Sequence, residues 1–230
     1  MQFKFYFLSS MGSYFVKGVA VTLALSVATI VAGTVLGLLF AVLRMSRVRV
    51  LQVLSTMYTT FVRGVPTLVF IYIVYYGINW NASPFVAGIV ALSICSSAYI
   101  AEIIRSGINA VSLGQMEASR ALGMPYLKTM RYVIIPQAIK NILPALGSQL
   151  ISTVKDTSLV SVLGLAELTY NTDTIRNATF LAFEPLIICA IIYFILTWAL
   201  KKGVDKMENV LNTYKEKLEE YDKLISSQEY

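Results

Sequence analysis

Five long apolar segments, separated by shorter polar ones, dominate the chain. Each is close to or longer than the roughly 20 residues that an α-helix needs to cross the hydrocarbon core of a bilayer. A backbone in lipid must pair its own polar groups, and a helix does so within one segment. The pattern therefore predicts an all-α integral membrane protein with five transmembrane helices. Their expected ranges are about 15–43, 51–78, 84–104, 135–154 and 180–200.

Interruptions within these segments predict local geometry. In the first, Gly33 and Gly37 form a G-x-x-x-G pair that permits close packing against another helix. In the second, the Arg-Gly-Val-Pro sequence at 63–66 predicts a break in the helix. In the fourth, Pro144 and Gly147 leave two interpretations open, a hinge or an ordinary helix irregularity.

Composition supports the membrane assignment and narrows the chemistry. The chain is 57% hydrophobic and only 14% charged, with a mean hydropathy of +0.67. It has no histidine, and Cys95 and Cys189 lie inside apolar segments, where packing is expected rather than a disulfide. No phosphate-binding loop, metal-binding motif or catalytic motif is present, so we expect no nucleotide hydrolysis, bound metal or cofactor on this chain.

The distribution of basic residues predicts an orientation. With the N-terminus outside and the C-terminus in the cytoplasm, 14 of the 19 lysines and arginines fall in or beside cytoplasmic segments. Because these residues are spread between apolar segments rather than gathered in one patch, they indicate membrane topology and not nucleic-acid binding. The five that fall elsewhere are Lys4, Lys17, Arg63, Lys155 and Arg176.

The polar segment at 112–136 is predicted to form two short cytoplasmic helices. Ser112, followed three residues later by a glutamine, has the spacing of a capping box. Gly123 suits the left-handed position at a helix end, and Pro125 suits the first turn of the next helix. Pro136 is expected to end that helix, because the residue before a proline disfavours helical geometry. Two helices joined at such a corner would form a stiff knob.

This segment resembles the EAA loop of bacterial ABC-importer permeases, in which E-A-A, three residues, G and nine residues precede I-x-L-P. Here a serine replaces the second alanine and the last block reads Val-Ile-Ile-Pro, which keeps the small and apolar characters. In that family the loop fits a socket on a separate ATPase. The resemblance thus implies a coupling role for Glu117, Ala118, Ser119, Arg120, Gly123 and Pro136.

Three further segments, at 61–67, 97–107 and 155–159, resemble the polar amino-acid (histidine/glutamine-type) permease family. The resemblance implies a type I ABC importer permease fold in a bacterial inner membrane. It also implies uptake of a polar amino acid, delivered by an extracytoplasmic binding protein, by alternating access. The expected assembly contains a second permease subunit, identical or paralogous, and two ATPase subunits that bind ATP and Mg²⁺.

Polar side chains at membrane depth are candidates for the substrate pathway, because a zwitterion needs partners for both of its charges. A structural role is the alternative, since small hydroxyls commonly line helix contacts, and an ion pair or gate is favoured for the glutamate among the candidates. Lys155 and Asp156, near the outer boundary, are candidates for a gate or a local ion pair. The pathway candidates are Arg63, Thr67, Ser93, Ser97, Glu102, Gln149, Ser152 and Thr153.

Two other classes of protein stay open at this level. A secondary transporter driven by an ion gradient would use Glu102 or Asp156 to carry a proton, and a structural membrane subunit would use neither. Residues 1–203 are expected to form the transmembrane domain, and 204–230 an amphipathic cytoplasmic tail. That tail is interpreted as a solvated or membrane-surface helix, with a partner contact as the alternative.

Overall fold

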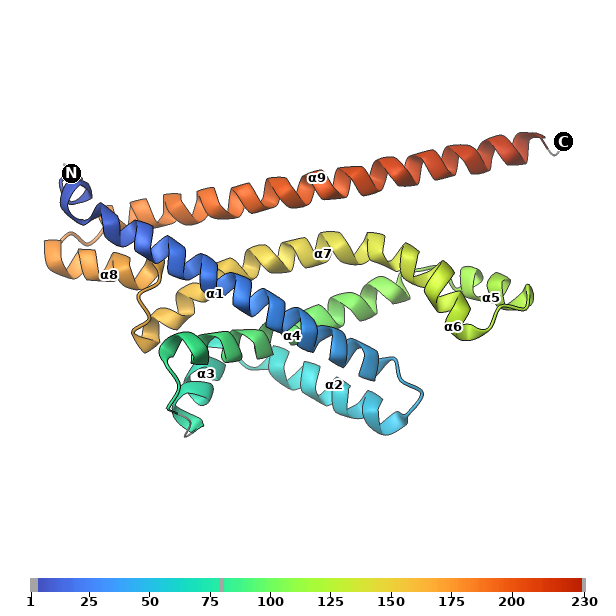
Figure 1. Ribbon diagram of the computed structural model, residues 1–230, viewed down its shortest axis with the longest axis horizontal. Coiled ribbons are helices and arrows are strands. Elements are labelled where there is room, and N and C mark those ends of the chain that lie inside the picture. Colours follow the sequence, from blue (N-terminus) through green and yellow to red (C-terminus); the bar gives the residue numbers. More distant parts are fainter. Residues whose placement is uncertain (1–3, 79–80, 229–230) are drawn as a thin grey trace. The chain divides into compact units, whose positions relative to one another are not determined.

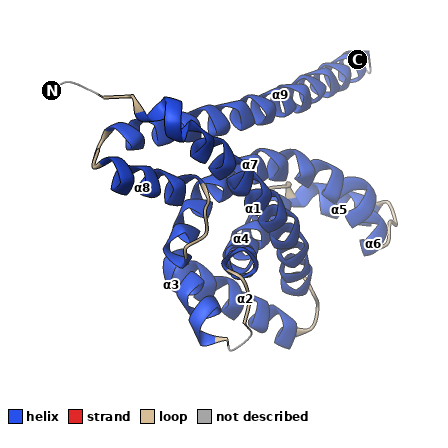
Figure 2. Cartoon of the chain, turned by 60° about the vertical axis from the view of Figure 1, so that its left-hand side comes forward, coloured by secondary structure: helices blue, strands red, loops and turns tan. Residues whose placement is uncertain are grey.

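A computed structural model describes the backbone of residues 4–78 and 81–228, and the side chains of this part up to residue 210. Within these ranges the regular structure is entirely helical (Figures 1 and 2). The α-helices are α1 Phe7–Arg44, α2 Arg49–Gly64, α3 Thr67–Tyr72, α4 Pro84–Asn109, α5 Leu113–Ala121, α6 Tyr126–Thr129, α7 Ile135–Asp156, α8 Leu168–Thr179 and α9 Glu184–Gln228. Two π-helical turns and a 3₁₀ segment complete the set: η1 Ile73–Gly77, η2 Met130–Ile134 and η3 Thr157–Leu163.

The chain forms two compact units. One unit comprises the residues up to Arg105 together with Gln149–Thr197. The other comprises Ser106–Ser148 together with the residues from Trp198 onward. The first unit therefore holds most of the apolar helices, and the second holds the predicted coupling segment and the C-terminal part of α9.

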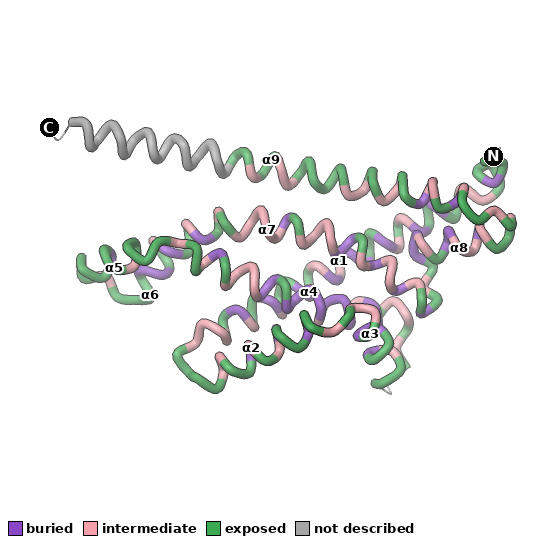
Figure 3. Tube along the Cα trace, turned by 180° about the vertical axis from the view of Figure 1, so that it is seen from behind, coloured by how far each residue is buried: buried purple, intermediate pink, exposed green. Residues whose placement is uncertain are grey.

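Close packing of α1 against α4 organises the first unit. A Cβ atom added at Gly37 would lie 2.7 Å from Cβ of Ile100, and one added at Gly33 would lie 3.1 Å from Cβ of Ser96. Only glycine permits this approach without displacing the neighbouring helix. The structure thus confirms the close helix packing that the G-x-x-x-G pair predicts, and it makes α4 the most buried of the long apolar helices (Figure 3).

The helices lie close to the predicted segments, although the number of membrane spans stays a prediction. By length and composition α1, α4 and Glu184–Val210 could each cross a membrane. A fourth span is possible if α2 and Thr67–Gly77, which are bent by 104°, count as one. Helix α7 fills the predicted fourth segment but does not meet the same criterion, because polar residues interrupt its apolar sequence.

Helix α9 begins four residues later than the predicted fifth span and runs without a break through residue 203. The predicted domain boundary at that point therefore stays a prediction. The side chains of 211–230, on which the amphipathic pattern of the tail largely depends, lie outside the described set.

A buried polar network anchors α8, an element that the hydropathy pattern did not predict. Glu167 is fully buried, and its carboxylate accepts hydrogen bonds from the Tyr170 amide at 2.7 Å and the Tyr193 hydroxyl at 3.1 Å. The Leu168 amide donates to Oγ1 of Thr22 on α1 at 3.2 Å. Burial raises the pKa of the Glu167 carboxyl, which precedes α8 and lies outside the apolar spans, while its hydrogen bonds act in the opposite direction. One glutamate therefore caps α8 and links it to α9.

Candidate functional site

A rigid corner joins α5 to α6 within the second unit. Gly123 has φ +83°, the left-handed conformation predicted from the sequence. The Met124 amide donates to the Ser119 carbonyl at 3.1 Å, and the Gly123 amide donates to the Arg120 carbonyl at 3.0 Å. This pair of bonds is a Schellman motif, which satisfies carbonyls that the end of α5 would otherwise leave free. The corner is thus fixed by backbone geometry.

Other local predictions for this segment were wrong in detail. Ser112 is the N-cap of α5, but its side chain makes no capping hydrogen bond. Pro125 precedes α6 as its N-cap instead of occupying the first turn. Pro136 does not end the second helix, because the π-helical turn before it has already shifted the hydrogen-bond register, and α7 continues through the proline.

The exposed surface of the corner carries both charged and apolar side chains. Glu117, Ala118 and Arg120 are exposed, whereas Ser119 is buried and donates through Oγ to the Gln115 carbonyl at 2.7 Å. That inward position thus holds a small residue, as the motif does. Three leucines on the same segment leave most of their surface uncovered, namely Leu113 at 80%, Leu122 at 84% and Leu127 at 79% exposed. Exposed leucines beside a charged pair of residues are typical of a protein-binding surface.

The i, i+3 ion pair considered for Glu117 and Arg120 is not formed. Among the described residues four ion pairs lie within 4.0 Å, and none includes either side chain. Arg120 instead donates through Nη1 to the Met124 carbonyl at 2.8 Å, across the corner. The carboxylate of Glu117 is therefore left available to an external group.

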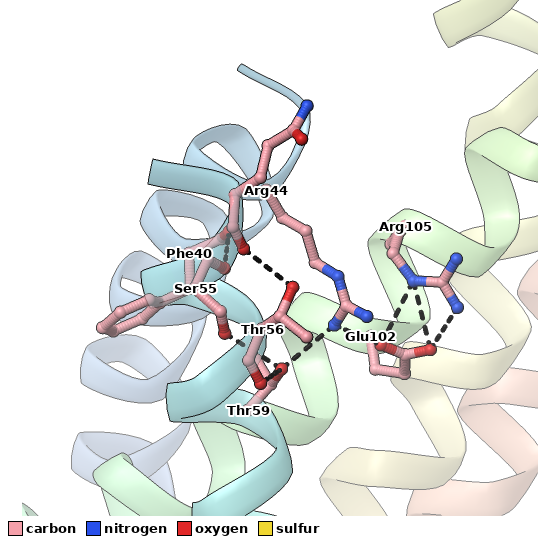
Figure 4. Close-up of polar contacts among 8 residues, drawn as sticks. Phe40, Arg44, Ser55, Thr56, Thr59, Glu102 and Arg105 are labelled. Atoms are coloured by element: carbon pink, nitrogen blue, oxygen red, sulfur yellow. Dashed lines mark hydrogen bonds and ion pairs between the residues drawn. The ribbon is translucent and has the colours of Figure 1, made fainter. Parts of the chain in front are cut away.

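A second charged cluster lies in the first unit at the end of α4 (Figure 4). Glu102 accepts from Nη1 of Arg44 at 2.9 Å and forms an ion pair with Arg105, which stands three residues away on the same helix. The same Arg44 nitrogen is 3.0 Å from Oγ1 of Thr59. Two guanidinium groups thus share one carboxylate and fasten α1, α2 and α4 together. This arrangement agrees with the ion pair favoured for Glu102, but its partner Arg44 is 58 positions away in sequence.

The predicted break in the second segment is present and produces a sharp bend. Val65 and Pro66 are extended, and α3 begins at Thr67. The guanidinium carbon of Arg63, in the last turn of α2, lies 5.4 Å from the centre of the Tyr99 ring on α4. This distance suits a cation–π contact.

Thr67 belongs to a second group of polar side chains. The Thr67 side chain and Asp156, at the end of α7, are both near enough to the Cys95 thiol to interact with it. Gln149, Ser152 and Asp156 fall on one face of α7 by their spacing, and all three are half-buried. The fold thus brings polar residues of α3 and α7 close to α4.

Three of the remaining four candidates are buried, and the fourth is exposed. Ser93 and Ser97 are buried, and their hydroxyls bond to the Thr29 carbonyl at 3.4 Å and to the Tyr58 hydroxyl at 2.6 Å, respectively. Thr153 is also buried and donates to the Gln149 carbonyl at 3.0 Å. Lys155 is exposed, and it takes part in none of the ion pairs within 4.0 Å that the described residues form.

These features are those of a helical membrane protein with an exposed corner between α5 and α6 and with polar side chains gathered between its apolar helices. The chain belongs to the family of binding-protein-dependent transport system inner membrane components, whose family model matches residues 33–201. It is thus a membrane-embedded permease subunit of an ABC importer, a transport component and not an enzyme, as its resemblance to this family predicted.

The chain is similar to several named permeases. It is 39% identical over 202 residues to the probable glutamine ABC transporter permease protein GlnM of Bacillus subtilis (strain 168), covering 86% of this chain and 94% of that protein. It is 38% identical over 187 residues to the arginine transport system permease protein ArtQ of the same organism, covering 80% of this chain and 85% of that protein.

Solved structures agree with the fold. The crystal structure of an amino acid ABC transporter with histidines is similar to this chain with a TM-score of 0.87 and 43% identity, covering 91% of this chain and 99% of that one. The inward-facing MetNI methionine ABC transporter is similar at a TM-score of 0.71 and 21% identity, covering 88% and 98%, which shows the fold alone. The type I importer permease fold is thereby confirmed.

Proposed function

We propose that this chain carries a polar amino acid across the inner membrane, together with a second permease subunit and two ATPase subunits. The substrate is delivered by an extracytoplasmic binding protein, and ATP with Mg²⁺ binds to the ATPases. The N-terminus is outside and the C-terminus is cytoplasmic. Support comes from the family, from relatives named for glutamine and arginine transport, and from the basic-residue distribution.

The observation that carries the coupling role is the exposed, stiff corner between α5 and α6. An ATPase that grips Glu117, Arg120 and the neighbouring leucines would displace the whole segment, because the Schellman bonds at Gly123 resist local deformation. Exposed leucine surface gives the contact its affinity and the charged groups give it register. Ala118 takes part because it allows the ATPase to approach α5 closely. Pro136 takes part because it lies at the start of α7.

For the substrate pathway we propose the half-buried face of α7 that carries Gln149, Ser152 and Asp156. Polar groups at this depth are costly against lipid, so a water-filled path or another protein surface suits them better. Thr67 and Arg63 flank this path from the broken segment, with Lys155 and Asp156 at its outer end as gate residues. Ser93, Ser97 and Thr153 support the walls, because their hydroxyls are engaged in helix packing.

A secondary transporter is disfavoured by the surroundings of Glu102. Both of its carboxylate oxygens accept hydrogen bonds from arginine side chains, an arrangement that a carried proton would disrupt. We therefore assign Glu102 to holding the helices together and not to moving a proton.

The test is uptake of labelled glutamine and arginine into vesicles that contain this chain, its ATPase and its binding protein. We expect uptake to require ATP and the binding protein and to continue after an ionophore collapses the ion gradients. Uptake that stops with the ionophore but survives ATP removal would instead identify a secondary transporter.

A further inference from the structure

The turn between α1 and α2 carries a concentration of positive charge. Arg44, Arg47 and Arg49 lie within six residues of one another, and the first acidic residue of the whole chain is Glu102. Arg44 points into the chain, where it meets that glutamate and Thr59. Arg47 and Arg49 are exposed. The turn therefore presents two guanidinium groups at the surface where the apolar helix α1 ends.

Hydrogen bonds hold this turn in one shape. The Val48 amide donates to Oγ of Ser46 at 3.1 Å, and Nε2 of Gln52 donates to the Ser46 carbonyl at 2.6 Å. The Ser46 amide in turn donates to the Leu43 carbonyl at 3.2 Å. Basic groups on a fixed turn lose less conformational freedom when they bind an anion than the same groups on a flexible loop.

Helix α2 turns a polar face inward and an apolar face outward. Ser55 and Thr59 are buried, and Ser55 donates through Oγ to the Phe40 carbonyl of α1 at 2.7 Å (Figure 4). The outward residues recur at spacings of four and three, and each is more than half exposed. We name them the α2 apolar face, which consists of Val50, Leu54, Met57 and Phe61. A helix on a water-facing surface has the reverse arrangement, so this face meets lipid or another protein.

The length of the α2 apolar face matches one leaflet of a bilayer. The eleven steps from Val50 to Phe61 cover about 16 Å at 1.5 Å per residue. Half of a hydrocarbon core is about 15 Å thick. The face begins beside the basic turn, and shortly after its other end the chain bends by 104° into Thr67–Gly77. A basic site followed by an apolar stripe of this length is complementary to a phospholipid with a negatively charged headgroup.

Charge favours such a lipid over a second copy of the same face. Residues 1–101 contain six basic residues and no acidic one, so this face of a second copy would offer Arg47 and Arg49 no opposite charge. Anionic phospholipids carry a phosphate, which a guanidinium group binds through two parallel hydrogen bonds. A free phosphate would satisfy the arginines but would leave the α2 apolar face uncovered.

We propose that the α1–α2 turn and the α2 apolar face bind one anionic phospholipid. Its phosphate lies at Arg47 and Arg49, and one of its acyl chains lies along the face from Val50 to Phe61. The inference goes beyond the proposed function, because it needs only the membrane location of the family and neither the substrate nor the ATPase contact. The bound lipid would fix the start of α2 at the membrane surface.

The test compares phosphatidylglycerol with phosphatidylcholine around the full chain in vesicles. Trp80 and Trp198 are replaced by phenylalanine, and Met57→Trp places a single fluorescent reporter on the α2 apolar face, about 10 Å along the helix from Val50. Phospholipids with brominated acyl chains quench the reporter on contact. Mixtures in which only one of the two lipids is brominated give their relative affinity. We expect phosphatidylglycerol to be preferred by about fivefold or more.

Charge variants locate the headgroup. Arg49→Gln should lower the preference about fivefold, and the addition of Arg47→Gln should lower it by a further factor of similar size. Arg49→Lys should keep most of the preference, which is not expected if loss of the arginine merely unfolds the turn. Lys17→Gln removes an exposed charge near the other end of α1, so it is the matched control and should have no effect.

Each other outcome overturns the proposal. Equal quenching by the two lipids would mean ordinary lipid contact without headgroup selection, and quenching by neither would mean that a protein such as a second permease subunit covers the α2 apolar face. An equal loss of preference in Lys17→Gln would mean a response to net charge alone, and an equal loss in Arg49→Lys would mean an altered turn. A preference abolished by added inorganic phosphate would mean a free-anion site. None of these measurements involves transport, so their failure leaves the proposed function standing.

Discussion

Glu102 and Glu117 stand fifteen residues apart, yet the fold gives them opposite surroundings. Glu102 is shared by Arg44 and Arg105 at a site where α1, α2 and α4 meet. Glu117 is exposed on α5, it takes part in none of the ion pairs that the described residues form, and three leucines of the same segment are exposed as well. One carboxylate is satisfied inside the chain, and the other is available to a partner.

The comparison predicts which region holds the helices together and which region a partner moves. A permease needs a firmly joined helical unit, and it also needs a surface on which another protein can act. Stability should therefore depend on the Glu102 cluster, and coupling should depend on the α5–α6 corner. Substitutions of the same chemical kind in the two regions should have different consequences.

The largest effect is expected from Gly123→Pro. Proline fixes φ near −65°, which is incompatible with the observed +83°, and such a substitution costs about 3 kcal/mol or more locally. We expect ATPase attachment and ATP-driven uptake to be lost while membrane insertion is retained, measured by co-purification and vesicle uptake. Gly114→Ala is the control, because a Cβ there meets only ordinary contact distances. Normal co-purification of the proline variant would remove the corner from the coupling mechanism.

Glu102→Ala should produce the next largest effect, on stability. Two arginines would lose their shared carboxylate at a site where each side chain is less than a third exposed. We expect a loss of about 2–3 kcal/mol in unfolding free energy, measured by denaturation of the purified chain in detergent. Glu102→Asp tests whether the charge alone suffices, and it should recover part of the loss. An unchanged stability in the alanine variant would mean that the cluster does not hold the helices.

Glu117→Ala should show the reverse pattern. Stability should change by less than about 0.5 kcal/mol, because the side chain is exposed and forms no ion pair with another described residue. Affinity for the ATPase should fall by about tenfold, corresponding to roughly 1.4 kcal/mol, if the carboxylate meets a charged or hydrogen-bonding group there. Titration of the reconstituted permease with purified ATPase measures this directly. A destabilised chain with unaltered ATPase affinity would reverse the assignment of the two glutamates.

The smallest expected effect extends the comparison to a third glutamate, Glu167. Since burial raises the pKa of its carboxyl in the folded chain, the folded state binds the proton more tightly than the unfolded state does. Its contribution to stability is therefore greatest at low pH and declines as pH rises from the unfolded value of 4.5 through the folded pKa. In Glu167→Gln that decline should disappear, as measured by melting temperature across this range. An identical pH profile in both proteins would show that the carboxyl does not ionise differently on folding.

Structural features that depend on residues close together in the sequence could be predicted, whereas features that depend on distant contacts could not. The break at 63–66, the close packing at Gly37 and the left-handed Gly123 depend on one residue type and its neighbours, and each was predicted. The two short helices of the 112–136 segment were also predicted locally, whereas its coupling role stays a prediction from the spaced motif. Local chemistry is visible in a single sequence.

Features that depend on distant contacts were missed or only partly predicted. Arg44 meets Glu102 only after α1 folds beside α4, and helix α8 is secured by contacts to Thr22 and Tyr193. The prediction for Ser112 was wrong for the opposite reason. The sequence has a favourable local pattern for a capping hydrogen bond, but the Ser112 side chain does not form that bond in the folded chain. The available signal for α8 was Glu167, a polar residue directly before the helix in a stretch of low hydropathy, and a search based on apolar length does not detect it.

Accessibility of a single thiol at Ala118 is the most direct test of the central claim that the α5–α6 corner is a cytoplasmic ATPase contact. In a chain whose Cys95 and Cys189 are replaced by alanine, Ala118→Cys would be exposed to a membrane-impermeant maleimide in vesicles of known orientation. The account predicts labelling in inside-out vesicles, no labelling in right-side-out vesicles, and protection when the purified ATPase is added. Labelling from the outer face, or labelling that the ATPase leaves unchanged, would contradict it.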